Sequence, residues 1–264
     1  MKLQWYLRRL RAMTAGEIAR RGRMQFQIAV WRRRYFEQGG APEARFAAST
    51  RGFSSALTDA ASLAIAEETR ASVIAAADGV LRGRWPLYAV ERNDVGEDID
   101  WHLDPKHGAR TPADEYSYAI WDYAGSAASA VEFDVKYVLE FSRHHHTTVL
   151  AAAYWLTGEA RYAEAAAGQV LSWCRANPFL HGVHWLSAIE TGVRLISLTW
   201  VRRLLAGWGG VAAAFEENPL FLQRLYEQQW LLSRRFSYGS SANNHLILEA
   251  AGLFAASCAM PWDR

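Results

Sequence analysis

The sequence predicts an all-α protein made of antiparallel helical hairpins. Of its 264 residues, 51% are hydrophobic, which is enough to bury a large core. From residue 132 onward, apolar side chains recur with the period of an α-helix, as at Tyr162, Ala166, Val170 and Trp173. The breaks between these stretches are short, so neighbouring helices should run antiparallel. Successive hairpins of this kind can curve into an incomplete ring, the (α/α) toroid, although no strict sequence repeat marks its units.

A basic helix is predicted over residues 15–37. Thr14 is suited to cap it, because Glu17 stands three residues further on, which is the spacing of a capping box. Arginines alternate with apolar residues along this helix, a pattern of either a solvated basic face or a helix lying on a membrane surface. A run of glycine and proline then breaks the chain. We therefore expect a basic helical segment, 1–40, followed by a helical domain, 41–264.

The next part of the chain divides into a helix and an irregular stretch. Residues 58–81 are rich in alanine and predict a helix that begins near Thr58. Residues 82–125 contain many glycines and prolines and predict loops and short extended pieces. The tryptophans of this stretch are Trp85, Trp101 and Trp121. A long irregular stretch in a compact domain is often functional, so these aromatics are candidates to wall a groove.

The second half of the chain predicts helix after helix. The expected ranges are 134–157, 160–176, 185–206, 217–235 and 243–258. Glycine or proline stands near each break, which is where a helix is expected to end.

Composition narrows the class of function. The formal net charge is +2, from 29 basic and 27 acidic residues, which argues against a general nucleic-acid binder. The chain has 12 Trp and 11 Tyr, whose flat rings suit sugars, although most are expected in the core. Cys174 and Cys258 lie in apolar helical stretches and are expected to be free, buried thiols. No metal-type spacing appears and no cofactor is implied.

The most informative motif is Ser240-Ser241-Ala242-Asn243-Asn244-His245. It follows a loop and opens an apolar helix, so one Ser or Asn in it is explained by helix capping. Capping does not explain two asparagines and a histidine in a row. Helix N-termini also favour anions, and a carboxylate placed there would meet N–H groups, amide donors and an imidazole. The motif therefore predicts a binding or catalytic site.

Two further motifs combine charged and aromatic residues. In the first, Glu140, Arg143 and His144 share one face of a continuous helix, which indicates either a surface for an acidic sugar or a buried ion pair. The three histidines at 144–146 point about 100° apart on a helix, so they do not predict a metal site. In the second, Trp185 precedes Glu190 and Arg194, whose spacing fits either a simple salt bridge or part of a groove.

Over roughly residues 80–262 the chain resembles the heparinase II/III-like polysaccharide lyases. The resemblance rests on Trp101 to Pro105, Asp134 to Arg143, Leu156 to Tyr162, Gly182 to Trp185 with Glu190 and Arg194, and Ser241 to His245. It implies an N-terminal (α/α) toroid, followed in relatives by a β-sandwich. It also implies β-elimination on uronic-acid polysaccharides such as glycosaminoglycans or alginate, so the expected partner is an acidic polysaccharide or oligosaccharide.

The resemblance also implies roles for particular residues. Asn244 would hydrogen-bond the uronate carboxylate and His245 would assist charge neutralisation or proton transfer, a task like that of an oxyanion hole. The expected substrate-binding residues are Asn243, Arg143, His144, Trp185, Glu190 and Arg194. Two alternatives stay open: a carbohydrate-binding pseudo-enzyme module, and a glycoside hydrolase on an (α/α) barrel that uses paired carboxylates.

In that family, a tyrosine well downstream of the Asn-Asn-His motif transfers protons, and a further histidine follows. This chain stops at Arg264, so we expect a truncated form without the β-sandwich, inactive or nearly so on its own. It shows no apolar signal segment and no run as long as a membrane span, which by sequence indicates the cytoplasm. The resemblance offers a periplasmic or secreted location instead.

Overall fold

The computed structural model describes residues 13–46, 57, 60, 63–96, 98–124, 133–238 and 242–260, with the side chains of 121–124 left out. The chain divides into two compact units, Met1–Ala41 and Pro42–Arg264. The expected helix start at Thr58, the Trp121 side chain, and Ser240 and Ser241 lie outside these residues.

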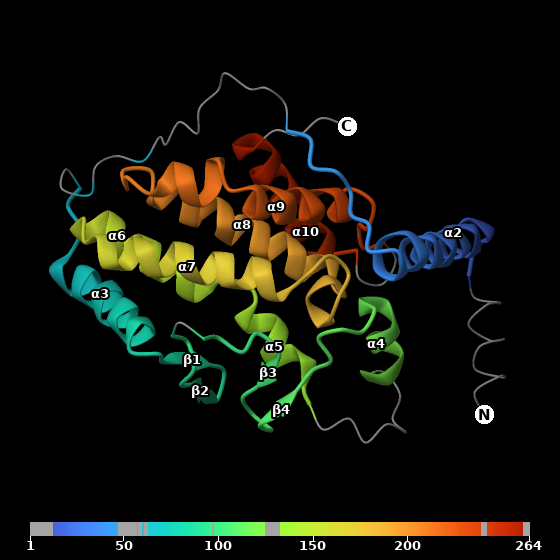
Figure 1. The fold of residues 1–264 in the computed structure, drawn as a ribbon, viewed down its shortest axis with the longest axis horizontal. Helices are drawn as coiled ribbons and strands as arrows, with labels where there is room; N and C mark the ends of the chain where they lie inside the picture. Colours follow the sequence, from blue (N-terminus) through green and yellow to red (C-terminus); the bar gives the residue numbers. More distant parts are fainter. Residues whose placement is uncertain are drawn as a thin grey trace. The chain divides into compact units, whose positions relative to one another are not determined.

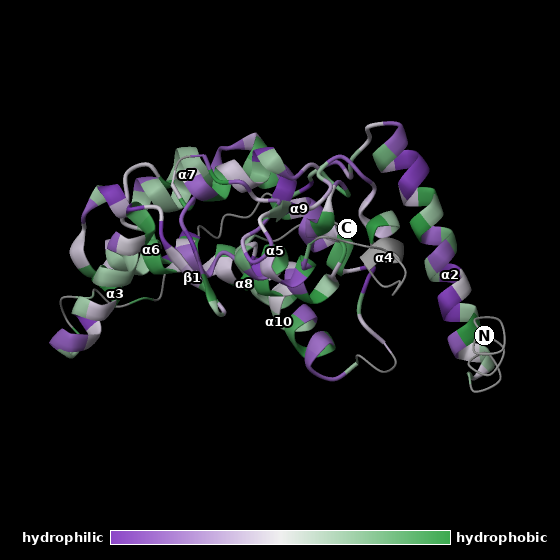
Figure 2. Cartoon of the chain, turned by 90° about the horizontal axis from the view of Figure 1, so that it is seen from below, coloured by the Kyte–Doolittle hydropathy of each residue, from purple (hydrophilic) through white to green (hydrophobic). Residues whose placement is uncertain are grey.

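The first unit contains one long helix, α2, over Ala15–Trp31. The predicted capping box is present: the Thr14 side chain accepts from the Glu17 backbone N–H, and the Glu17 carboxylate accepts from the Thr14 N–H. Hydrophilic and hydrophobic residues alternate along α2 (Figure 2). Its continuation, η1 over Arg32–Glu37, is a π-helix, so the predicted range holds while its hydrogen bonding changes after Trp31.

The second unit is mainly helical, which confirms the all-α prediction (Figure 1). Its α-helices are α3 Glu67–Leu81, α4 Ser117–Ala124, α5 Val135–Phe141, α6 His145–Thr157, α7 Ala160–Ala176, α8 Ala188–Leu204, α9 Pro219–Leu232 and α10 Asn244–Ala259. Two short helices, η3 Val183–Trp185 and η4 Ala212–Glu216, lie in connections. Closure of the hairpins into a toroid stays a prediction.

Helices α6 to α9 alternate in direction, as the short connections predict. Trp173, near the end of α7, donates from Nε1 to the Ser142 hydroxyl just before α6, at 2.9 Å. Arg194 in the first half of α8 donates to Gln228 in the second half of α9 at 2.7 Å. Both contacts join the beginning of one helix to the end of its neighbour, so each pair is antiparallel.

Helices α8 and α10 run in the same direction and touch through two glycines. A Cβ built on Gly192 would lie 2.6 Å from the Leu248 carbonyl oxygen, and one on Gly252 would lie 2.6 Å from the Gly192 Cα. Further along, Leu198 and Thr199 of α8 line one cavity with Ala256 and Ala259 of α10. Because residue numbers rise together along both helices, Asn244 lies at the end where α8 begins.

The irregular stretch forms two β-hairpins and a short helix. Strands β1 (Trp85–Leu87) and β2 (Val90–Arg92) pair antiparallel, as do β3 (Leu103–Asp104) and β4 (Ala109–Arg110). The hairpins lie beside α5 in Figure 1. These pairs match the expected short extended pieces, whereas the sequence does not predict α4.

Two predicted helices have different bounds. The range 134–157 is broken at residues 142–144, where His144 takes a left-handed backbone (φ 63°) and separates α5 from α6. The break is stabilised from other helices, since the Ser142 hydroxyl contacts both Trp173 and Arg194. Helix α3 begins at Glu67, and residues 64–66 before it are not helical.

The core of the second unit is rich in large aromatic side chains. Trp101, Trp173, Trp185, Tyr162 and Phe141 are almost fully buried. Both cysteines are free, but Cys258 is exposed on α10, so the prediction of two buried thiols holds only for Cys174. Within the residues that the structure describes, no helix is long and apolar enough to cross a membrane.

Candidate anion-binding site at the helix N-termini

The candidate site lies where α6, α8 and α10 begin. Arg143, two residues before α6, contacts Glu190 in the first turn of α8, so these two helices begin close together. The parallel contact of α8 with α10 brings Asn244 to the same end. Helix N-termini carry partial positive charge and unpaired N–H groups, so three at one end favour an anion.

Arg143 is the centre of a partly buried ion-pair network. Its Nε and Nη2 donate to the two carboxylate oxygens of Glu190, at 2.6 and 2.9 Å. Its Nη1 forms a further ion pair with Glu140. The hydrogen bond to Glu190 raises the pKa of Arg143 above its ordinary value, so the guanidinium stays charged. A bidentate pair of this kind fixes geometry as well as charge.

The network continues outward from Glu140. Tyr88, in the β1–β2 turn, donates its hydroxyl to Glu140 Oε2 at 2.6 Å. The His145 ring lies nearby, with Nδ1 at 3.9 Å from Glu140 Oε1. Partial burial lowers the pKa of His145, so the ring is neutral at neutral pH and able to accept a proton.

Arg194 supports this end of the molecule from inside. It is fully buried and donates to Gln228 Oε1, to the Ser142 hydroxyl and to the His184 carbonyl, at 2.7, 2.7 and 2.9 Å. Its guanidinium also lies 4.3 Å from the centre of the Trp173 ring. One side chain thus joins α8 to α9, to the corner before α6 and to η3.

Behind the site lies a buried cluster of histidines and aromatic rings. The His146 ring stacks on Phe141 with ring centres 4.3 Å apart, and His144 packs against Trp101 and Trp173. Burial lowers the pKa of His144, His146 and His184, and that of His146 to about 3. These imidazoles are therefore neutral parts of the core at neutral pH.

The buried histidines predict loss of stability in acid. The unfolded chain binds a proton near pH 6.5 at each histidine, whereas folded His146 binds one only near pH 3. The free energy of unfolding should therefore fall as pH drops below 6.5, and His146 should account for about 2 kcal/mol of that loss at pH 5. Urea unfolding at pH 7 and pH 5 should show this loss, reduced by about 2 kcal/mol in His146→Leu. An unchanged difference in that variant would contradict the assignment.

The start of α10 presents an exposed side-chain amide. The Asn243 side chain accepts from the Asn244 backbone N–H at 2.8 Å and so caps the helix. Asn244 is exposed, and its carboxamide makes no hydrogen bond to the residues that the structure describes. His245 beside it is half-buried. Further in, the buried Glu249 carboxylate accepts from the Ser237 N–H and hydroxyl, at 2.6 and 2.5 Å, which fixes the connection before α10.

The structure brings some of the predicted residues together and separates others. Arg143 and Glu190 are in direct contact, and Asn243, Asn244 and His245 share their end of the molecule. In contrast, His144, Trp185 and Arg194 are fully buried, so they lie behind this surface. Glu190 pairs with Arg143 rather than with Arg194, and the broken helix turns His144 away from Glu140 and Arg143 into the core. Direct binding of sugar by any of these side chains stays a prediction.

The sequence did not indicate that Tyr88 and Gln228 belong to this region, and it assigned no partner to Ser142, which lies inside the predicted 140–146 motif. Tyr88 lies in a two-residue turn within an irregular stretch, where no periodicity assigns it a neighbour. Gln228 and Ser142 contact Arg194 across the fold. Only a glutamine in the middle of an apolar helix face offered a signal, because a buried amide needs a partner.

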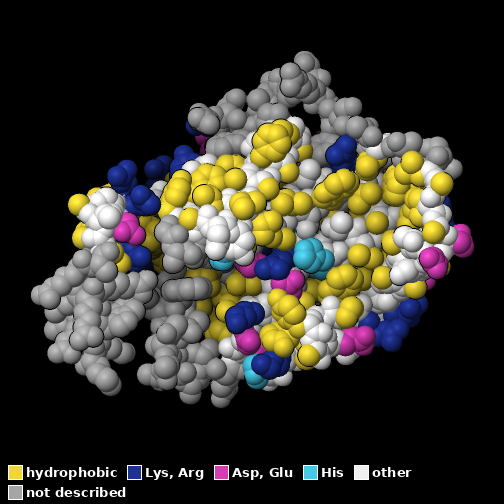
Figure 3. Space-filling model, turned by 180° about the vertical axis from the view of Figure 1, so that it is seen from behind, with side chains coloured by type: hydrophobic (Ala, Val, Ile, Leu, Met, Phe, Trp, Pro, Cys, Tyr) yellow, Lys and Arg dark blue, Asp and Glu magenta, His cyan; other side chains and the backbone are white. Residues whose placement is uncertain are grey.

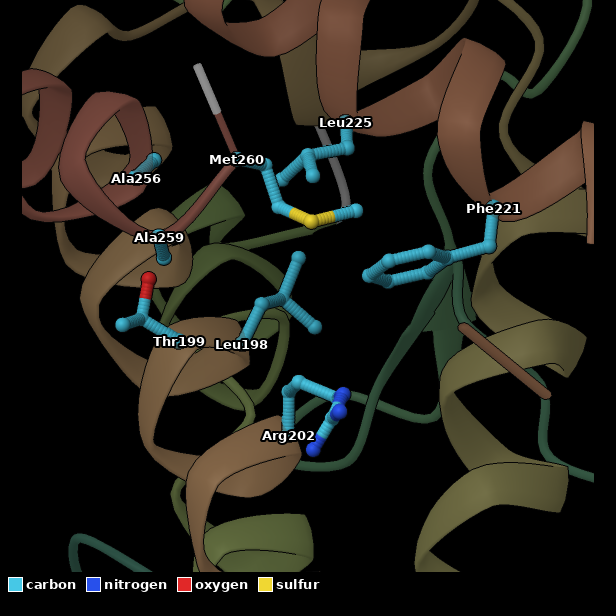
Figure 4. A pocket seen from close by; sticks show the side chains of 8 residues that line it. All are labelled: Leu198, Thr199, Arg202, Phe221, Leu225, Ala256, Ala259 and Met260. Atoms are coloured by element: carbon cyan, nitrogen blue, oxygen red, sulfur yellow. The ribbon is translucent and has the colours of Figure 1, made fainter. Parts of the chain in front are cut away.

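Two other kinds of site have less support. Within the described parts of the chain, no group of three His, Cys, Asp or Glu side chains is placed to hold a metal ion. The cavity between α8, α9 and α10 in Figure 4 is lined mainly by apolar side chains and has a volume of about 10 Å³, too small for a sugar ring. In Figure 3, by contrast, charged side chains of both signs and histidines gather between hydrophobic surfaces.

Comparison with known proteins agrees with the resemblance seen in the sequence. The family model described as heparinase II/III N-terminus matches residues 44–262. Among solved structures, the chain is similar to a heparan sulfate lyase HepC mutant from Pedobacter heparinus, with 19% identity and a TM-score of 0.48. That match covers 89% of this chain but only 31% of the other. The comparison with curated proteins found no match to this chain. Because the family model covers most of its length, the chain belongs to the heparinase II/III N-terminus family.

Proposed function

We propose that this chain supplies the carboxylate-binding part of a polysaccharide lyase, which cleaves uronic-acid polysaccharides by β-elimination. Family membership supports the class of enzyme. The observation that carries the proposal is the meeting of three helix N-termini at one end, with the exposed Asn244 carboxamide and His245 on the last of them. An anionic sugar placed there gains from the helix dipoles and from the amide donor.

The proposed reaction needs a group that stabilises negative charge on the substrate carboxylate. A base removes the proton on C5 of the uronate, the C4–C5 double bond forms, and the bond from C4 to the leaving oxygen breaks. An acid then protonates that oxygen. Negative charge spreads onto the C6 carboxylate as the proton leaves, so a donor held at that position lowers the barrier. Asn244 is suited to this task through its side-chain N–H groups, with His245 beside it.

Arg143 has a positioning role in this proposal. Its donors are already used by Glu140 and Glu190. Separating Arg143 from these glutamates would cost free energy, because a partly buried carboxylate would lose its partner. Arg143 therefore holds the start of α6 against the start of α8, while Asn244 and His245 remain available to the sugar.

Binding measurements on the chain test the role of Asn244. Asn244→Ala should weaken binding of a uronate oligosaccharide by about tenfold, because a hydrogen bond to a charged group contributes about 1.5 kcal/mol or more. Titration calorimetry provides the affinity. The same oligosaccharide with its carboxyl groups reduced to alcohols is the control, and it should bind both proteins alike.

Equal loss of affinity for the charged and reduced sugars would contradict the role of Asn244 as a hydrogen-bond donor to the carboxylate.

Ultraviolet absorbance of the products identifies the type of reaction. A product with a C4–C5 double bond supports elimination. Binding of the oligosaccharide without such a product would favour a carbohydrate-binding module, and a saturated product would favour a hydrolase.

A further inference from the structure

Two hairpin turns hold one tyrosine of α5 between them. Tyr88, in the turn between β1 and β2, meets the Tyr137 ring edge to face, with ring centres 5.4 Å apart. Lys106, in the turn between β3 and β4, places its ammonium group 5.6 Å from the centre of the same ring. The Asp104 carboxylate fixes the start of α5 by accepting from the Asp134 N–H at 2.6 Å. The three side chains therefore form one surface.

Tyr88 is an unusual residue for its position. It has a left-handed backbone (φ 56°), which costs a non-glycine residue about 1 kcal/mol. In its two-residue turn only the first central residue has a positive φ, which is the kind of turn that favours glycine there, and the sequence has Tyr88 instead. The side chain is 64% exposed, so burial of the ring does not explain the choice. Strain at an exposed aromatic residue points to a use of that ring.

Lysine side chains lie in the β3–β4 turn and in the first turn of α5. Lysine is rare in this sequence, and Lys106 and Lys136 are two of its three lysines. Both are exposed, and neither forms an ion pair within the part of the chain that the structure describes. Their ammonium groups are therefore free to meet an anion.

The nearby carboxylates already have partners. Glu140 pairs with Arg143 and accepts from Tyr88. Asp104 accepts from the backbone N–H groups of Lys106 and Asp134 and contacts the His107 ring at 2.6 Å. These two carboxylates are thus held by other partners, whereas the Lys106 ammonium group has no ion pair among the described residues, so it can meet an anionic group on a sugar.

We propose that Tyr88, Tyr137 and Lys106 form a subsite for an acidic oligosaccharide, separate from the carboxylate site at Asn244. The exposed Tyr88 ring stacks on the apolar face of a sugar, and Lys106 binds a carboxylate or sulfate group on that sugar or the next one. Tyr88 reaches Glu140 and through it Arg143 and Glu190, so the subsite is joined by direct contacts to the end where α8 begins.

This inference rests on the proposed function, because it assumes that the ligand is an acidic sugar chain. Two substitutions separate the ring from the hydroxyl. Tyr88→Asn removes the ring but keeps a residue that tolerates the left-handed backbone. Tyr88→Phe keeps the ring and loses only the bond to Glu140. Phe254→Ala is the matched control, since Phe254 is an exposed aromatic residue (72%) ten residues further along α10 than Asn244.

Affinity is measured for heparin-derived and alginate-derived oligosaccharides, which distinguish sulfate from carboxylate recognition. Tyr88→Asn should weaken binding of at least one by about tenfold, whereas Tyr88→Phe should stay within about threefold of the wild type. Lys106→Gln should weaken binding most at low salt, because its contribution is a screened charge interaction. Phe254→Ala should bind as the wild type does.

The outcomes distinguish the subsite from the proposed function. If the wild type binds the sugars and Tyr88→Asn binds them equally well, the subsite is wrong and the proposed function stands. If Tyr88→Phe weakens binding as much as Tyr88→Asn, the ring is not a stacking platform. If the wild type binds neither sugar, the subsite and the acidic-sugar ligand of the proposed function both fail.

Discussion

Arg194→Leu is expected to destabilise the fold by about 4 kcal/mol. The substitution removes donors from three buried acceptors, Gln228 Oε1, the Ser142 hydroxyl and the His184 carbonyl. The Ser142 hydroxyl keeps its hydrogen bond from Trp173, so Gln228 Oε1 and the His184 carbonyl are the acceptors that lose a donor without such a replacement. Each buried polar group left without a partner costs about 1–3 kcal/mol. The contact with the Trp173 ring is lost as well. Urea unfolding at pH 7, followed by the fluorescence of the buried tryptophans, measures the change.

Arg194→Lys is the matched comparison. It keeps the positive charge and the apolar stem but lacks the fork that reaches three partners at once, so an intermediate loss is expected. One result would contradict this role of Arg194. If Arg194→Leu unfolds within 1 kcal/mol of the wild type, an apolar core serves equally well here, as happens at some buried ionic sites. The guanidinium would then not be what joins α8, α9 and the α5–α6 corner.

Gly252→Ala should have the second large effect, about 3 kcal/mol. The added methyl group would lie 2.6 Å from the Gly192 Cα and closer still to its carbonyl oxygen. Both are backbone atoms of α8, so no side chain can turn away to make room. Helix α10 must move outward, which also displaces Asn244 at its start. Thermal unfolding measures the loss, and oligosaccharide affinity measures the displacement.

Gly168→Ala is the control for that experiment. Gly168 lies in α7, where a new Cβ meets nothing within 4 Å. Alanine there should stabilise the protein by up to about 1 kcal/mol, through its better helix propensity. If Gly252→Ala and Gly168→Ala both raise the melting temperature, the close contact between α8 and α10 is refuted.

Much of the helical pattern could be predicted from local signals. The predicted range 160–176 matches α7 because local residues set both limits. Gly158, with a left-handed backbone, ends α6 just before α7 begins, and Pro178 follows the end of α7. The break at residues 142–144 could not be predicted in this way. It depends on hydrogen bonds from Trp173 and Arg194, which are distant in the sequence, so tertiary contacts override helix periodicity there.

The candidate site was predictable in part for the same reason. The position of the Asn243–His245 motif could be predicted, because polar residues at the start of a helix are a local signal in the sequence. The pairing was not, because the i, i+4 rule joins Glu190 to Arg194, whereas the fold offers Glu190 a better partner in Arg143. Burial of Arg194 and exposure of Tyr88 likewise depend on which faces meet, and one sequence does not specify that.

The alternating direction of the helices has a consequence for how such a protein can change. Helices α6, α8 and α10 all begin at the candidate site, so the connections at residues 158–159 and 205–218 lie at the opposite end. Insertions or deletions there lengthen or shorten the molecule away from Asn244 and Arg143. The connection at 177–187 has no such freedom, because its His184 carbonyl accepts from Arg194. Changes in length at 158–159 and 205–218 should therefore be tolerated better than changes at 177–187, next to the candidate site.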